Sequence, residues 1–437
     1  MLLLRKVGHA FVPRSHKTLT ESVTTITLNS TDDSNNLTCH DNSADLTVLG
    51  SETVSGSVVG PMPSNIQRCR CKVTLKGIIR TRTDGRIAGV CERATHLATH
   101  TFLNETLMRM TLEGAGCESV AENRNFQIPF KFCMTDFEAR FNFSGQGSTA
   151  MAWTSAVLPP SVSSKKKTTK KTTSITGPAT KSAWPLKQSQ RDVTVDCLVS
   201  YTIIANVSVG RRQISSTSLE FFYVPVSPTE LPVAVHGDLN DYKFIDRQAI
   251  KRSLSFKSNP SRAVQIQAEQ PVPIIINMLN RTGSTTVNFT ISTIGLELDS
   301  VPIKCHVNAC LVSILFITPM WQEDRAPTLY EGRCSQSSKI HEEISHPQGC
   351  LLPITDWKRI TPEEHAGKHE QRNVAMMKYR FVVDGEMPCP TFFTPLVSKR
   401  YHLITVVSFR HTGGWAVLRL SLPLQIKYND LSPPHGE

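Results

Sequence analysis

The stretch that decides the fold is LTVLGSETVSGSVVGPMPSNIQRCRCKVTLKGIIRTRT, residues 46–83. It predicts two short strands around a turn that begins at Gly50, then a proline-containing loop and a long third strand. In the third strand, alternate residues from Val73 to Ile79 share one face, and lysine, threonine and arginine mostly take the other. A period of two with one apolar face indicates a strand with one buried and one solvated side. Gly56 predicts a bulge or the close approach of another backbone in the second strand.

The same alternation recurs along most of the chain. In the clearest case every odd-numbered residue from Val193 to Val209 is apolar, and alternate residues from Ala416 to Ile426 repeat the pattern near the end. Residues 92–103 are an exception, because their composition is compatible with a short helix that runs into a strand. Almost no other stretch has helical periodicity, so we expect an all-β protein.

A length of 437 residues exceeds one ordinary core and predicts two domains. We expect a flexible tail over 1–22, a first β-sandwich over 23–230 with a disordered lysine-rich insert at 162–190, and a second β-sandwich over 231–430 with a polar insertion at 332–373. Three prolines mark the boundary: Pro225, Pro228 and Pro232. The predicted fold class is therefore all-β, with two tandem antiparallel β-sandwich domains of immunoglobulin-like type.

Composition favours an intracellular location. Arg5 and Lys6 interrupt the apolar N-terminus after four residues, which is not typical of a signal peptide, and no apolar run is long enough to span a bilayer. Twelve cysteines are spread thinly, unlike a disulfide scaffold. Seven Asn-x-Ser/Thr sequons keep an alternative open, a secreted or cell-surface immunoglobulin-like adhesion protein, although chance is the better explanation of these sequons.

Several motifs occur in the same order as in a known family. They are Gly50-Ser-Glu-Thr-Val-Ser-Gly56, Val73-Thr-Leu-Lys-Gly77, Phe126-x-Ile-Pro-Phe130, Leu158-Pro-Pro-Ser161 followed by Tyr201, Cys389-Pro-Thr followed by Tyr401, and Leu422-Pro-Leu-Gln-Ile426. Together they resemble the strands of arrestin-like proteins, specifically the fungal arrestin-related proteins with arrestin N- and C-terminal domains, over residues 23–429. The residues of the polar-core ion pair of that family cannot be assigned in this chain.

The resemblance implies a non-catalytic adaptor or scaffold. Arrestin-like proteins bind the cytoplasmic segments of membrane proteins and link this cargo to endocytic trafficking or ubiquitination. Many fungal members carry PPxY motifs that dock a HECT-type ubiquitin ligase, but this chain has none. The implied partners are membrane-protein cytoplasmic segments and either endocytic machinery or a HECT-type ligase, with no nucleic acid. The implied location is the cytoplasm, with recruitment to the plasma membrane or endosomes.

The net charge of +11 points to acidic partners, and five of the charges lie in one run. The candidate residues for binding an anionic partner are Lys165, Lys166, Lys167, Lys170 and Lys171. Each lysine would contribute about 1 kcal/mol beside anionic lipid headgroups. A nuclear-import signal and a solvated loop without a specific partner are the alternatives. Phosphorylation would offset these charges at interleaved candidate sites: Thr168, Thr169, Thr172, Thr173 and Ser174.

Neither a catalytic motif nor a complete metal motif is present. The pairs Cys69/Cys71 and Cys305/Cys310 have nearby histidines in the sequence, but a structural zinc site normally needs two pairs at fixed loop spacing, so we expect buried free thiols. We therefore expect no metal, no cofactor and no enzymatic activity. A carbohydrate-active sandwich enzyme is a third alternative, and it would require two carboxylates that face one cleft.

Overall fold

The structure is a computed structural model, and its coordinates place the chain in the following ranges: 24–29, 47–50, 52–61, 68–86, 93–113, 125–143, 151–155, 158–163, 195–225, 242–249, 262–277, 280–298, 301–317, 339–360, 372–385, 388–411 and 414–429. The first half of the chain forms β1 (Thr25–Asn29), β2 (Thr47–Leu49), β3 (Thr53–Pro61), β4 (Arg68–Arg86), β5 (Arg93–Glu113), β6 (Asn125–Cys133), β7 (Ala139–Phe143), β8 (Met151–Ser155), β9 (Val162–Ser163), β10 (Val195–Val209) and β11 (Arg212–Val224). The second half forms β12 (Ile245–Ala249), β13 (Ala263–Ala268), β14 (Ile274–Ile276), β15 (Gly283–Ile294), β16 (Lys304–Ile317), β17 (Lys339–Pro353), β18 (Lys358–Ile360), β19 (Arg372–Val383), β20 (Phe392–Phe393), β21 (Val397–His411), β22 (Gly414–Leu424) and β23 (Ile426–Tyr428).

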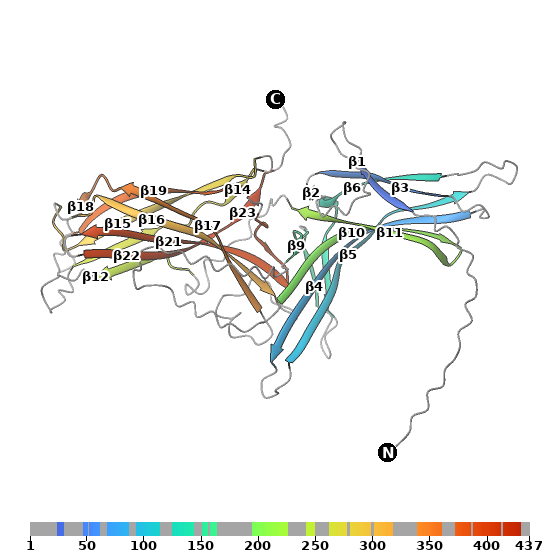
Figure 1. The fold of residues 1–437 in the computed structure, drawn as a ribbon, viewed down its shortest axis with the longest axis horizontal. Coiled ribbons are helices and arrows are strands. Elements are labelled where there is room, and N and C mark those ends of the chain that lie inside the picture. The colour runs from blue at the N-terminus through green and yellow to red at the C-terminus, as the bar shows by residue number, and fades with distance from the viewer. Residues whose placement is uncertain are drawn as a thin grey trace, which may run out of the picture.

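The prediction of an all-β protein is confirmed. Within these ranges the one helical element is a single 3-10 turn, η1 (Met134–Asp136), and none of the described residues forms a helix able to cross a bilayer. Figure 1 shows β1–β11 grouped at one end of the molecule and β12–β23 at the other. The short helix considered for residues 92–103 is wrong, because β5 is extended from Arg93 and pairs with β4 along its length. Threonine is frequent in β5, and β-branched residues pack well when a partner strand lies alongside.

β4 lies between β5 and β10 in a sheet with the order β2-β11-β10-β4-β5, to which β9 adds beside β10. A second sheet, β1-β3-β6, supplies the opposing apolar side chains. Two glycines allow close packing, as the sequence predicted for Gly56: a Cβ there would lie 2.7 Å from the Phe130 ring. A Cβ at Gly77 would lie 2.6 Å from the Phe102 ring. Both positions must therefore lack a side chain.

The first core is centred on Tyr201 of β10. Its ring lies 5.5 Å from that of Phe102 and 5.2 Å from that of Tyr223, and both contacts are edge-to-face. Phe102 also stacks on Phe141 at 5.6 Å. Burial of each of these aromatic side chains stabilises the fold by roughly 1.5–3 kcal/mol. This core also takes in Leu315, Ile317, Phe392, Leu396 and Val397 from the second half of the chain.

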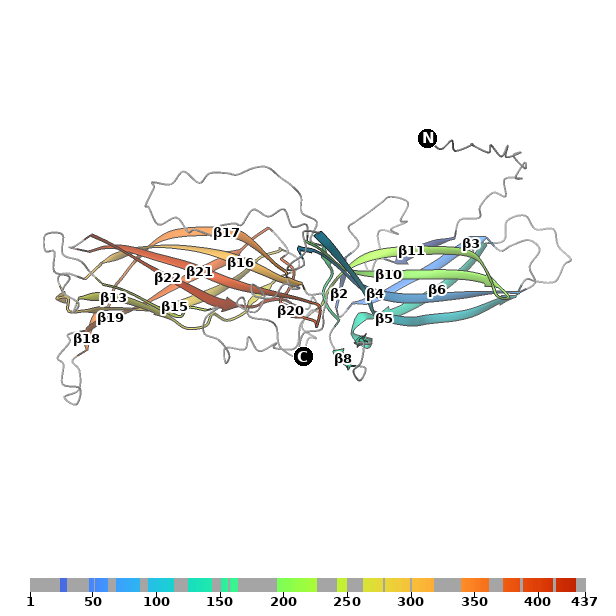
Figure 2. The same ribbon diagram turned by 90° about the horizontal axis from the view of Figure 1, so that it is seen from below.

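The second core lies between two further sheets. One has the order β12-β13-β15-β19-β18, and the other has the order β17-β16-β21-β20 with β22 paired to β21. Alternate residues of β19 and β22 point into this core, and they include Tyr379, Phe381, Leu418 and Leu420. The predicted alternation from Ala416 onward is therefore confirmed. Figure 2 shows the strands of the two sheets running along the same direction at this end of the molecule.

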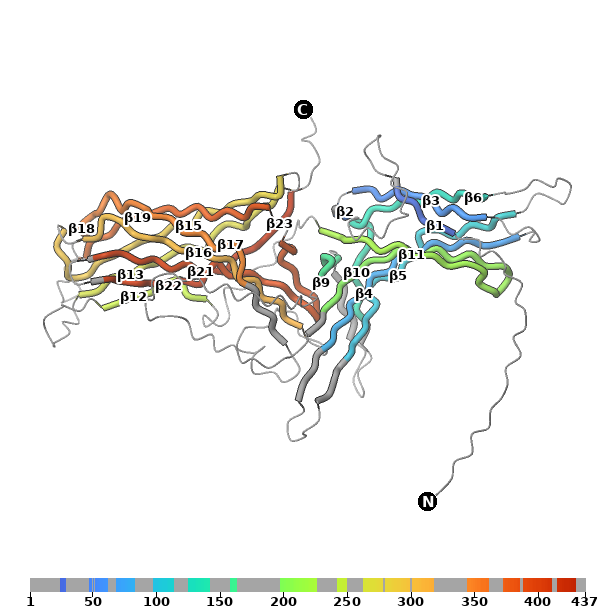
Figure 3. The backbone as a smooth tube through the Cα atoms, viewed as in Figure 1, coloured from blue at the N-terminus to red at the C-terminus, as the bar shows by residue number. Residues whose placement is uncertain are grey.

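The strand order of the first half recurs in the second. β4, β5, β9 and β11 are joined around β10 in the same way as β16, β17, β20 and β22 around β21. Each half also adds one short parallel pair, β2 with β11 and β14 with β23. The tube in Figure 3 lets the reader follow both paths.

One local motif is present in both halves. The Tyr201 hydroxyl donates to the carbonyl oxygen of Pro159 at 2.5 Å, and the Tyr401 hydroxyl donates to that of Cys389. Two residues after each carbonyl, a side-chain hydroxyl accepts a hydrogen bond from a backbone amide. Ser161 Oγ accepts from Tyr223 N of β11 at 2.8 Å, and Thr391 Oγ1 accepts from Ile426 N of β23 at 3.0 Å. The Pro-Pro-Ser and Cys-Pro-Thr segments are therefore equivalent clips.

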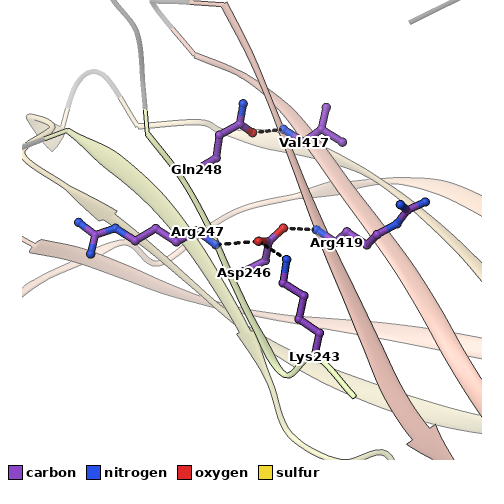
Figure 4. Close-up of polar contacts among 6 residues, drawn as sticks. All are labelled: Lys243, Asp246, Arg247, Gln248, Val417 and Arg419. Atoms are coloured by element: carbon purple, nitrogen blue, oxygen red, sulfur yellow. Dashed lines mark hydrogen bonds and ion pairs between the residues drawn. The ribbon is translucent and has the colours of Figure 1, made fainter. Parts of the chain in front are cut away.

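Side chains rather than a continuous strand ladder join β12 to the edge of β22 (Figure 4). Asp246 Oδ2 accepts from Arg419 N at 2.7 Å, and Gln248 Oε1 accepts from Val417 N at 2.7 Å. The other carboxylate oxygen of Asp246 accepts from Lys243 Nζ at 2.5 Å. These bonds satisfy edge amides of β22 and close this side of the second core.

The range 332–373, predicted as a polar insertion, contains β17 and β18. β17 pairs with β16 through a register shift between Ala309 and Leu311, and His346 in the same region has a φ of 51°. The irregular backbone interrupts the alternation, so the sequence pattern does not resemble a strand.

Candidate docking face

The candidate site is the outer face of β4, the strand that the opening sequence encodes. Because side chains alternate along a strand, the even-numbered residues of β4 point away from the first core. Val73, Leu75 and Ile79 on the inner face are fully buried. Arg68 and Arg82 are basic and exposed near the ends of this face. Between them lie four further basic residues, Arg70, Lys72, Lys76 and Arg80, of which the two arginines are exposed. We call these four residues together with Arg109 the basic row.

Arg109 joins the row from β5. It lies directly opposite Lys72, and directly opposite residues of an antiparallel pair point to the same face. On the other side of β4, the cross-strand neighbours in β10 are Ser208, Asn206 and Thr202, and Leu198 lies opposite Arg80. Hydroxyl and amide groups therefore border most of the row.

Carboxylates are scarce on this face. Glu220 of β11 is opposite Thr202, two strands away from Lys76. Glu113 lies at the far end of β5 and pairs with Arg68, whose Nη2 is 2.5 Å from Oε1. In the part of the chain that the structure describes, no ion pair involves a member of the basic row. The row therefore presents charge that is not neutralised by those residues.

The geometry suits an extended or flat anionic partner. Arg70 and Arg80 are ten residues apart on one strand, which corresponds to about 33 Å at the usual rise per residue. Arginine forms bidentate contacts with carboxylate and phosphate, whereas lysine acts as a point charge. The row can therefore bind several acidic groups along its length, but it contains no nucleophile or general base.

The buried titratable groups of the first core lie beneath this sheet and do not add chemistry to it. Burial raises the pKa of the Cys197 thiol to about 12, and the neighbouring Cys389 adds to this shift. Burial raises the pKa of Cys389 to about 11, against the opposing effect of Lys399. Burial likewise holds the pKa of Tyr201 well above its ordinary value. Since a thiol reacts as the thiolate, these groups stay protonated and inert near neutral pH.

The site residues predicted from sequence lie outside the described residues. This applies to the lysines (Lys165, Lys166, Lys167, Lys170 and Lys171) and to the candidate phosphorylation sites (Thr168, Thr169, Thr172, Thr173 and Ser174). No disulfide joins Cys69, Cys71, Cys305 or Cys310 to another described cysteine, and the first three are buried, in line with the prediction. In the described ranges no group of three or more histidine, cysteine or acidic residues is placed to hold a metal ion.

The basic row was missed as a site by sequence reasoning. Its alternation was recognised, but it was interpreted only as the solvated side of a strand. The signal lies in the cross-strand neighbours, because the contribution of Arg109 and the position of Glu220 depend on the register of β5, β10 and β11. No family model matches this chain, and no curated protein matches it either.

Proposed function

We propose that this chain is a non-catalytic, arrestin-like adaptor built from two tandem antiparallel β-sandwich domains of immunoglobulin-like type. In this proposal it binds the cytoplasmic segment of a membrane protein and links that cargo to endocytic trafficking or ubiquitination without a PPxY motif. The repeated strand order and the equivalent clips at Tyr201 and Tyr401 support the tandem architecture. The order of the arrestin-like motifs in the sequence supports the family.

The observation that carries the functional proposal is the basic row. Five cations face outward from β4 and β5 among hydroxyl and amide neighbours. A cytoplasmic segment rich in acidic or phosphorylated residues would satisfy those charges along an extended path. An anionic membrane surface beside the cargo would add to the attraction. The proposed location is the cytoplasm, with recruitment to the plasma membrane or endosomes.

No disulfide joins any two of the eight described cysteines, which is usual for proteins of reducing compartments and supports the adaptor over a secreted adhesion protein. One observation favours the adhesion alternative: Asn280 of the sequon Asn280-Arg-Thr282 is exposed in a turn, and its Oδ1 accepts from the Thr282 hydroxyl at 2.7 Å. A glycosidase-sensitive shift in mass that disappears in Asn280→Gln would support that alternative.

The test is binding of a fluorescent twelve-residue glutamate-rich peptide, with and without phosphoserine, to the full chain. The test variant carries Lys72→Gln, Lys76→Gln and Arg80→Gln. If each charged contact contributes about 1 kcal/mol, the triple variant should bind about a hundredfold more weakly. The matched control carries Lys304→Gln and Arg410→Gln, two exposed basic residues of β16 and β21, and should bind the peptide as the wild type does. Equal affinity of the triple variant and the wild type would refute a role for the row.

Proximity labelling in cells tests the cargo. Recovery of membrane transporters together with endocytic or ubiquitin-pathway proteins, lost in the triple variant, is the expected result. Recovery of secretory-pathway residents with glycans on the chain would contradict the adaptor.

A further inference from the structure

The outer edge of β19 has main-chain groups that no described residue pairs with. Backbone N–H and C=O groups alternate in direction along a strand, and in β19 the bonds of Val382 fix the direction. Val374 is paired with Lys358 of β18 on the outer side. Val382 N donates to Gln348 Oε1 at 3.1 Å, and the Gln348 amide donates to the Val382 carbonyl.

The even-numbered residues of β19 therefore direct their main-chain groups outward. The register with β15 is continuous from Gly283 to Ile294, so no bulge changes this alternation. Met376, Lys378 and Arg380 lie between the two ends that β18 and Gln348 cover. Each has one N–H and one C=O, which gives six groups along this edge that the described residues leave unpaired.

The edge of β22 in the same half contrasts with this gap. Asp246 and Gln248 accept hydrogen bonds from the amides of Arg419 and Val417 there, and Lys243 pairs with Ser421 (Figure 4). An exposed strand edge is a template for pairing with another chain, and most proteins cover or charge such edges. β18 and Gln348 cover the two ends of the outer edge of β19, and the edge is open to the described residues from Met376 to Arg380. This length fits a short extended segment.

The side chains around the gap determine what that segment must be. Met376 is 72% exposed, and Lys378 and Arg380 are exposed on the solvent face. Arg380 Nη2 donates to Ser284 Oγ at 3.2 Å, and the other outward neighbours in β15 are threonine and asparagine. β15, β18 and β19 contain no aspartate or glutamate. Charge on this face is therefore positive and uncompensated within the three strands.

We propose that this edge binds an extended, acidic segment of a partner protein as an additional antiparallel strand. Antiparallel pairing follows the direction of β18, and strand addition uses the main-chain groups for affinity and alternate side chains for specificity. The partner segment, written from N to C, has the pattern acidic–x–acidic–x–apolar. Its acidic residues lie opposite Arg380 and Lys378, and its apolar residue lies opposite Met376. The x side chains point to the core side, where Cys350 and Leu352 are partly buried.

This site is separate from the basic row and does not depend on the proposed function. It lies on the second half of the chain, and it recognises main-chain groups as well as charge. The row in the first half offers side-chain charge on the face of a sheet. An adaptor with both features would hold two partner segments at once.

The experiment measures binding of a fluorescein-labelled peptide that contains Glu-Val-Glu-Val-Leu to the full chain. We expect saturable binding that falls at least tenfold when the backbone nitrogens of the two glutamates, which face the edge, are methylated. The charge-reversed variant Lys378→Glu/Arg380→Glu should also lose at least tenfold and should gain affinity for a Lys-Val-Lys-Val-Leu peptide. This exchange of specificity shows that a loss is not caused by misfolding.

Two outcomes overturn the proposal. Binding that is insensitive to backbone methylation would mean ionic attraction without strand addition. The other outcome is that the peptide fails to bind. If the chain then self-associates, and Lys378→Glu/Arg380→Glu abolishes this, the edge is assigned to a second copy. If it instead sediments with phosphatidylserine vesicles, and the same variant abolishes this, the edge is assigned to a membrane surface. The sensitivity to backbone methylation should persist in the variant Lys72→Gln/Lys76→Gln/Arg80→Gln, because β4 lies inside its sheet and offers side-chain charge without a free strand edge. This readout distinguishes failure of the edge proposal from failure of the proposed function.

Discussion

Replacement of Tyr201 by phenylalanine should destabilise the first half of the chain by about 2 kcal/mol. The substitution keeps the ring and its contacts with Phe102 and Tyr223 but removes the hydroxyl that donates to the carbonyl oxygen of Pro159. Tyr201 and Pro159 are both buried, so water cannot replace the lost donor. A hydrogen bond contributes about 0.5–1.5 kcal/mol, and a buried acceptor left without a partner costs about 1–3 kcal/mol.

Differential scanning calorimetry measures this effect. A loss of 1 kcal/mol lowers Tm by about 2–4 °C in a unit of 150–250 residues, so Tyr201→Phe should lower the Tm of the affected transition by about 4–8 °C. Tyr223→Phe is the matched control, because that ring is equally buried and its hydroxyl makes no hydrogen bond with a described residue. A Tyr201→Phe protein that melts within about 1 °C of the wild type, or no more readily than Tyr223→Phe, would refute the clip as a stabilising element.

Two further predictions concern the second half of the chain. Burial lowers the pKa of His402 from 6.5 to about 4, and Arg400 adds to the effect. As pH falls, the unfolded state therefore binds a proton at this histidine before the folded state does. The free energy of unfolding should fall by about 3 kcal/mol as pH drops from 6.5 to 4. Titration of thermal stability against pH checks this, and His402→Phe should flatten that part of the profile; an unchanged slope would contradict it. Asp246→Ala should remove the acceptor for the Arg419 amide and destabilise the β12–β22 contact by about 1–3 kcal/mol. Hydrogen exchange at the Arg419 amide measures it, with faster exchange expected in the variant, whereas exchange at the wild-type rate would show that the carboxylate does not protect this edge.

The elements that sequence reasoning predicted best are those whose alternation is long and uninterrupted. β10 is an example: its odd-numbered residues from Cys197 to Val207 are buried, because one face of the strand meets the first core. β6 is another, with Phe126, Ile128 and Phe130 buried on alternate positions. The sequence prediction is wrong where local composition and tertiary pairing disagree. β5 has a composition compatible with a helix at its start, yet pairing with β4 keeps it extended.

The candidate sites were less accessible from sequence than the fold. The lysine run was conspicuous because its residues are consecutive, whereas the basic row is spread over two strands. The edge of β19 carries no sequence signal of its own. It is an edge only because β18 begins at Lys358, opposite Val374, and because β17 belongs to the opposite sheet.

The sequence by itself determined that the chain is all-β and which side chains of the regular strands face a core. The physical reason is that a period of two is a local property, set by the backbone and by the alternation of apolar and polar residues. Only the tertiary structure decided which strands are neighbours, which edges are covered by Asp246, Gln248 and Gln348, and which charges share a face. Those features depend on register between segments far apart in the chain, and no local pattern encodes register.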